Sequence, residues 1–177
     1  MSQAEIAGGQ TVPPNQLPAK GYQFRHFTLP CVDGGEIRLS DYRGRFNLVL
    51  VFTDGRPETA SLLSEMTRRY GEFKNSEAEI LVVAQLTSDE ALRMKERVGL
   101  PCPVLVDEDG RIHREVGASD SQENPAAAVY VTDRFEEIFG AYRTSEGEPL
   151  PTAAEVLNWL EFVNSQCPEC EPPEWPL

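Results

Sequence analysis

Two apolar runs separated by one helix-length segment constrain the fold of this chain most strongly. The first covers residues 46–52 (FNLVLVF), and the second covers residues 80–86 (ILVVAQL). Both are rich in β-branched or aromatic side chains, so each predicts a strand buried on both faces. Between them, Pro57 opens a segment with apolar side chains at helical spacing, because proline suits the first helical turn. This order predicts a crossover unit of an α/β sheet.

The rest of the chain adds elements on both sides of this unit. A Gly-Gly turn within residues 32–37 predicts a β-hairpin upstream. A helix capped by Thr87 or Ser88 is expected to end at Gly99. The remaining predicted elements are a strand (104–106), a helical segment (112–116), two antiparallel strands (127–131 and 137–142) and a helix after Thr152. This order predicts an α/β, thioredoxin-like fold with a central mixed β-sheet flanked by helices and an N-terminal β-hairpin extension.

Length and composition fit one such domain. The chain has 177 residues, of which 40% are hydrophobic and 25% charged, as in globular proteins with a substantial core. We expect a flexible arm over residues 1–20, which lack apolar periodicity and carry Gly, Gln, Asn and Pro. The thioredoxin-like domain is expected over residues 21–165, and a proline-rich tail over residues 166–177.

The charge balance excludes several classes of partner. The net charge is -13, which disfavours binding to nucleic acid or to an anionic membrane. The N-terminal residues show no signal-peptide pattern, and no apolar run is long enough to span a bilayer. These features predict a cytoplasmic protein. Four cysteines in such a protein suggest free thiols, redox chemistry or metal binding.

Two stretches resemble the alkyl hydroperoxide reductase/thiol-specific antioxidant (AhpC/TSA) family, which includes the peroxiredoxins. The first comprises residues 27–30 (FTLP), 32–34 (VDG) and 37–44 (IRLSDYRG), and the second comprises residues 100–110 (LPCPVLVDEDG). With the element order, the resemblance covers about residues 22–163. It implies a redoxin of the thioredoxin-fold superfamily, most members of which are redox enzymes.

The sequence departs from the family at the position where the resemblance implies the reactive cysteine. In the family this residue follows the first buried strand, at the start of the next helix. Here that segment, residues 53–61, reads TDGRPETAS, and no cysteine occurs between Cys31 and Cys102. Thr59 is the expected equivalent. A hydroxyl has no thiolate form and cannot become a sulfenic acid, so the usual peroxidase site is predicted to be absent.

A second family feature is also missing. The resemblance implies an arginine just before the fourth core strand, where it supports the thiolate, and thioredoxins place a cis-proline nearby. Residues 124–128 read NPAAA and contain no arginine. Arg56 is a candidate to replace that charge.

Cys167 and Cys170 form the remaining chemically suggestive motif, a CxxC pair. Such a pair can form a reversible disulfide or supply two ligands to one zinc ion. It follows the last predicted helix, and residues 144–177 carry seven glutamates and no Lys, Arg, Asp or His. Helix carbonyls and acidic neighbours disfavour thiolate, so the pair differs from a thioredoxin nucleophile.

Three functions remain open. The favoured one is a thiol–disulfide oxidoreductase with Cys167 and Cys170 as catalytic residues and a dithiol reductant as partner. The second is a catalytically inactive redoxin-fold module that binds or regulates a protein partner. The third is a structural zinc site at the CxxC motif, with further ligands from His26, His113 or a second subunit of a homodimer. No cofactor is expected, and Cys31 and Cys102 are interpreted as small packed residues.

Overall fold

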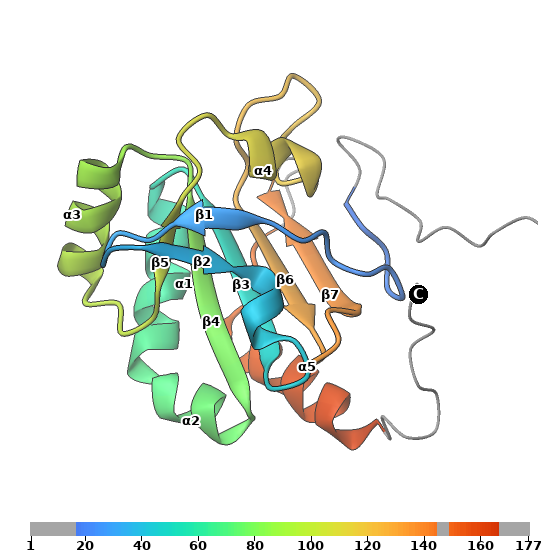
Figure 1. The fold of residues 1–177 in the computed structure, drawn as a ribbon. Helices are drawn as coiled ribbons and strands as arrows, with labels where there is room; N and C mark the ends of the chain where they lie inside the picture. The colour runs from blue at the N-terminus through green and yellow to red at the C-terminus, as the bar shows by residue number, and fades with distance from the viewer. Residues whose placement is uncertain (1–16, 145–148, 167–177) are drawn as a thin grey trace, which may run out of the picture.

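A five-stranded mixed sheet forms the centre of the fold in a computed structural model, which describes residues 17–144 and 149–166 (Figure 1). The strand order is β5-β4-β3-β6-β7. The first three of these strands are parallel, and β6 and β7 run antiparallel to their neighbours. The strands are β3 (Asn47–Thr53), β4 (Ala78–Ala84), β5 (Val104–Val106), β6 (Ala128–Thr132) and β7 (Ile138–Arg143). This arrangement confirms the predicted thioredoxin-like α/β fold.

Helices cover both faces of the sheet, unequally. They are α1 (Pro57–Arg68), α2 (Tyr70–Asn75), α3 (Ser88–Val98), α4 (Arg111–Glu115) and α5 (Ala153–Ser165). Buried side chains of α1, α2, α3 and α5 form one core cluster with the sheet. On the other face, α4 packs with the N-terminal segment and the hairpin. No helix within the described part of the chain is long and apolar enough to cross a membrane.

The N-terminal hairpin lies across the sheet on the face opposite α1 (Figure 1). Its strands are β1 (Thr28–Pro30) and β2 (Glu36–Arg38), followed by a short 3-10 helix, η1 (Leu39–Tyr42). Gly34 and Gly35 both have positive φ, which a glycine adopts without strain. The Val32 N–H donates to the Val104 carbonyl at 3.0 Å, which ties the hairpin to β5.

The central strand β3 separates two hydrophobic clusters. Its side chains alternate between the two faces of the sheet. Val49 and Val51 therefore pack against the helices, whereas Leu48, Leu50 and Phe52 pack under the hairpin. All seven residues of β3 are buried, as the unbroken apolar run predicts.

The helix boundaries differ from the sequence pattern in one place. Apolar spacing predicts one helix from Pro57 to Phe73, but the helix is interrupted at Arg69, which separates α1 from α2. The helix over 88–98 matches its signals. Thr87 forms a capping box with Glu90, and Gly99 ends α3 in the left-handed conformation, with φ 73°.

Candidate functional site

The loop between β3 and α1 lies where the family resemblance implies the reactive residue. Thr53 ends β3, and Pro57 begins α1. The carboxyl ends of β3, β4 and β5 share this edge of the sheet because the three strands are parallel, and α4 lies at the same edge (Figure 1). Thr59 lies in the first turn of α1, and only 1% of its surface is exposed.

Hydrogen bonds close this loop on itself. The hydroxyl oxygens of Thr53 and Thr59 are 2.6 Å apart. The Thr59 hydroxyl is also 3.0 Å from the Arg56 carbonyl oxygen, to which it can donate. The Gly55 N–H donates to the Thr53 hydroxyl oxygen at 2.9 Å. Both hydroxyl groups therefore make hydrogen bonds that stabilise the loop between β3 and α1.

Arg56 occupies the N-cap position of α1, but its guanidinium binds elsewhere. Its Nε lies 2.6 Å from an Asp54 carboxylate oxygen, and its backbone N–H donates to the same carboxylate at 3.2 Å. Arg56 contacts the Thr59 hydroxyl through its backbone carbonyl oxygen. The exposed guanidinium thus forms a local ion pair with Asp54, and its replacement of the family's arginine charge stays a hypothesis.

An arginine that the sequence analysis missed lies near this edge. Arg143, on β7, stands opposite Ala128 in the ladder with β6. Its guanidinium donates to the carbonyl oxygens of Gly117 and Ser119, both at 3.0 Å. These contacts fix the loop before β6. In that loop the peptide bond of Pro125 is trans, since no bond in the described segments is cis.

A buried acid–base pair, also missed, connects β5 to α4. The Nδ1 atom of His113 lies 2.7 Å from an Asp107 carboxylate oxygen, and both side chains are 1% exposed. The same carboxylate accepts the backbone N–H groups of Ile112 and His113. Burial raises the pKa of Asp107, but these hydrogen bonds, above all from the His113 side chain, outweigh it and hold the pKa below its ordinary value. The pair fixes the start of α4.

The His113 ring completes the packing beside β3. It contacts the Phe52 ring edge-to-face, with centroids 5.0 Å apart. The Nε2 atom is buried and has no hydrogen-bond partner among the residues that the structure describes. His113 is therefore a core residue bound to Asp107 and is not presented to a metal ion.

Neither described cysteine lies at the β3–α1 edge. Cys102 precedes β5 at its amino end, and burial raises the pKa of its thiol to about 12. Cys31 follows β1 and is partly exposed, and its Sγ lies 3.8 Å from an Asp33 carboxylate oxygen. Cys102 thus behaves as the small buried residue that was expected, and Cys31 is only half-buried.

The predicted catalytic pair, Cys167 and Cys170, lies outside the described residues. The helix that precedes it ends at Ser165. One residue earlier, Asn164 accepts a hydrogen bond from Asn47, the first residue of β3, at 2.7 Å. The end of α5 therefore lies at the edge of the sheet opposite Thr53.

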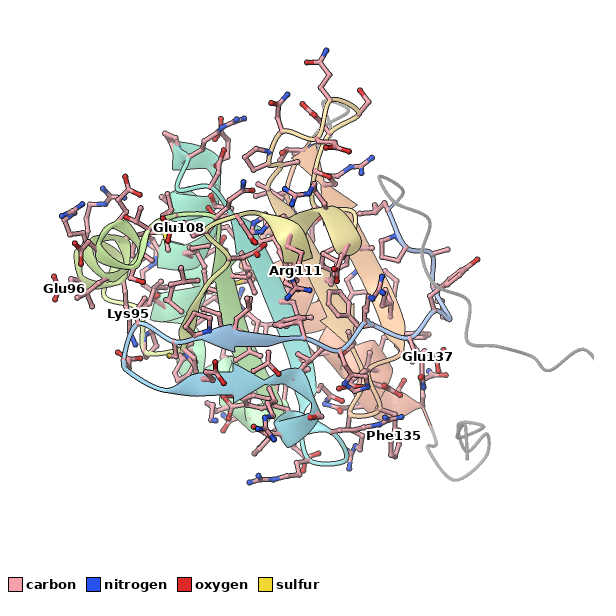
Figure 2. The ribbon with its side chains drawn as sticks, turned by 45° about the horizontal axis from the view of Figure 1, so that its top comes forward. Lys95, Glu96, Glu108, Arg111, Phe135 and Glu137 are labelled. Carbon is pink, nitrogen blue, oxygen red and sulfur yellow. The ribbon has the colours of Figure 1, made fainter. Side chains whose placement is uncertain are left out.

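No metal cluster is formed within residues 17–144 and 149–166. No three His, Cys, Asp or Glu side chains there gather into a group that could hold an ion. His26, the other predicted zinc ligand, lies 3.2 Å from Glu136. A shallow depression between β1 and the β5–α4 loop, beside Glu108 and Arg111 (Figure 2), has no cysteine in its lining.

Comparisons with known proteins agree with this fold. Peroxidoxin BcpB from Mycobacterium tuberculosis is 18% identical, with a TM-score of 0.72 over 82% of this chain and 98% of that one. AhpC from Mycobacterium tuberculosis is 19% identical, with a TM-score of 0.73 over 85% and 95% of the two chains. The reduced 2-Cys peroxiredoxin of Plasmodium vivax is 16% identical, with a TM-score of 0.72 over 83% of this chain and 83% of that one.

Likeness at these identities establishes the fold. No curated protein sequence matches the chain. The family model of AhpC/TSA matches residues 21–141, which is more than half of the 177 residues. The chain therefore belongs to the AhpC/TSA family.

Proposed function

We propose that this protein is a redoxin without a peroxidatic site, and that Cys167 and Cys170 carry a slow thiol–disulfide exchange. One observation supports the first part above all. The Thr59 hydroxyl stands buried and hydrogen-bonded where the family resemblance implies a reactive thiol. The sequence holds no cysteine between Cys31 and Cys102, so a different alignment of the loop would not supply a thiol either.

The state of the other thiols supports the second part. The Cys102 thiol is buried, and its pKa of about 12 keeps it protonated at neutral pH, whereas thiolate is the reactive form. Cys31 has no cysteine partner among the described residues. Cys167 and Cys170 are spaced for a reversible disulfide.

The proposed exchange is balanced as a two-electron reaction. Attack by one thiolate of the pair on a substrate disulfide breaks the substrate S–S bond and forms a mixed disulfide. Attack by the second thiolate forms the Cys167–Cys170 bond. The substrate leaves as two thiols, taking up the two protons and two electrons that the pair has lost. A dithiol reductant, the proposed partner, reverses the reaction.

The exchange is tested on the full chain with glutathione disulfide as oxidant and dithiothreitol as reductant. We expect the Cys167–Cys170 disulfide to form and to be reduced again, as seen by mass spectrometry after alkylation. A double Cys167→Ser/Cys170→Ser variant should lose this cycle, and Cys31→Ser is the matched control that should keep it. Exchange that persists in the double variant, or a pair that never oxidises, would overturn the assignment.

The absence of peroxidase activity is tested separately. Hydrogen peroxide with dithiothreitol should be consumed no faster with the protein than without it. Fast consumption would overturn the first part of the proposal. If peroxide is spared and the pair also stays reduced, the closed hydroxyl pair of Thr53 and Thr59 favours the second candidate, a catalytically inactive binding module.

A further inference from the structure

The N-terminal segment of the described chain is fastened along β7. Residues 21–24, called the strap here, make three backbone hydrogen bonds with the start of β7 and the turn before it. Gly21 N–H donates to the Ile138 carbonyl at 3.0 Å, Ile138 N–H donates to the Tyr22 carbonyl at 2.9 Å, and Phe24 N–H donates to the Glu136 carbonyl at 2.8 Å. Figure 2 shows the strap passing Glu137, with which Gln23 forms an isolated bridge. The strap covers part of the outer strand of the sheet.

Glu136, in the turn between β6 and β7, is unusual in two ways. Its backbone is left-handed, with φ 69°, a conformation that non-glycine residues seldom adopt. Its side chain is also buried, 1% exposed, and neither carboxyl oxygen has a hydrogen-bond partner within the described segments. Burying an ionised carboxylate without hydrogen bonds costs free energy. The backbone carbonyl of the same residue, Glu136, accepts the hydrogen bond from Phe24 of the strap.

The groups around this carboxyl come from three segments. His26, which follows the strap, places Nε2 3.2 Å from Oε2 of Glu136, with half of its side chain exposed. Arg43, after η1, places Nε 3.9 Å from the same oxygen. Asp133, in the same turn, acts on the Glu136 carboxyl through its like charge. Burial raises the pKa of Asp133, and backbone hydrogen bonds and the charges of Arg134 and Arg43 oppose this rise.

We propose that Glu136 is a proton-operated latch, which holds the strap on β7 while its carboxyl is protonated and loosens the strap when it ionises. The latch is independent of the thiol chemistry proposed above. Loosening would uncover backbone groups at the start of β7, an outer strand, and such an edge is a template for pairing with another strand.

The direction of the pH dependence follows from the environment of the carboxyl. Burial raises the pKa of Glu136 to about 7 from an ordinary value of 4.5, Arg43 opposing this rise and Asp133 adding to it. Between these two pH values fastening the strap takes up a proton, so the latch weakens as the pH rises. If the loosened strap leaves the carboxyl fully in water, Glu136 alone weakens the latch by at most about tenfold from pH 6 to pH 8.

His26 acts in the opposite direction. Burial, with Arg43 next, lowers the pKa of His26 from its ordinary value of 6.5. A loosened strap therefore takes up a proton on His26 more readily, and this reduces the change near pH 6. The His26→Gln variant should show the full effect of Glu136.

The latch is tested by hydrogen–deuterium exchange on the full chain. The amides of Gly21, Phe24 and Ile138 are followed at pH 6 and pH 8, after correction for the intrinsic exchange rate at each pH. In His26→Gln we expect lower protection at pH 8, by up to about tenfold. Glu136→Gln, which is neutral at both pH values, should keep the higher protection throughout.

Glu123→Gln is the matched control, because Glu123 is also left-handed, with φ 62°, but its side chain is exposed. It should leave the pH dependence unchanged. Strap protection that does not depend on pH, or a dependence that survives in Glu136→Gln, would overturn the latch. Should Glu136→Gln fail to fold, infrared spectroscopy of the wild type decides. A protonated-carboxyl band at pH 6 that fades by pH 8 supports the latch, and its absence at pH 6 overturns it.

Discussion

The hydroxyl oxygens of Thr53 and Thr59 lie 2.6 Å apart at the carboxyl end of β3, away from solvent. Each hydroxyl has a further partner in the same loop, the Gly55 N–H for Thr53 and the Arg56 carbonyl for Thr59. A redoxin needs an accessible, acidic thiol at such a place to reduce peroxide. The place holds instead two hydroxyls that stabilise the turn into α1.

Replacing Thr59 by valine tests this structural role. Thr59→Val keeps the side-chain shape but removes the hydroxyl, so the Arg56 carbonyl loses a donor and Thr53 loses a partner. We expect the free energy of unfolding to fall by about 1–2 kcal/mol, measured by urea denaturation. Thr59→Ser keeps the hydroxyl and should lose less. Equal stability of Thr59→Val and the wild type would contradict the role.

Asp107 should make the protein sensitive to acid. Its pKa is below the ordinary value of 3.8, since hydrogen bonds from His113 and Ile112 outweigh the effect of burial. The ionised Asp107 carboxylate therefore stabilises the folded protein above its ordinary pKa of 3.8. This contribution is lost as the pH falls through the lower pKa that Asp107 has in the folded protein. In Asp107→Asn the wild-type loss below about pH 4 should become shallower. Urea denaturation between pH 3 and pH 7 measures this, and an unchanged acid slope would exclude Asp107 as a source.

The two described cysteines should react with alkylating reagents at very different rates. Cys102 is buried, with a pKa raised to about 12, whereas Cys31 is partly exposed. In the Cys167→Ser/Cys170→Ser variant at pH 8, iodoacetamide should therefore modify Cys31 and leave Cys102 intact until the protein is unfolded. Peptide mass spectrometry identifies the modified residue. Early modification of Cys102 in folded protein would show that the segment before β5 opens.

Gly140 should resist substitution because of the Trp159 ring. A Cβ atom at Gly140 would lie 3.3 Å from three atoms of that ring, whose Nε1 donates to the Tyr142 hydroxyl at 2.5 Å. Gly140→Ala should lower stability by about 1–3 kcal/mol and shift Trp159 fluorescence. Gly71→Ala is the control, since Gly71 lies in α2 with open space around it and alanine favours helix. A neutral Gly140→Ala would mean that the ring moves at little cost.

The elements that sequence reasoning predicted are those with local signals. The buried strands follow from apolar runs around Val49 and Leu81, and α3 follows from the Thr87 cap and the Gly99 stop. The break at Arg69 was missed because apolar spacing continues through it.

The site residues that were missed depend on distant segments. Asp107 and His113 are joined only because the start of α4 folds back over the end of β5. Arg143 reaches the loop before β6 from the neighbouring strand, and no local pattern marks that approach. The lack of a thiol at the β3–α1 loop could be predicted, because it is a matter of composition.

The hydrogen bond between Asn47 and Asn164 shows that the end of α5 and the β3–α1 loop lie at opposite ends of β3. It places the end of α5 at the start of β3, whose seven residues run from Asn47 to Thr53, a length of roughly 20 Å. A partner bound over the β3–α1 loop would therefore leave the last turn of α5, which ends at Ser165, uncovered.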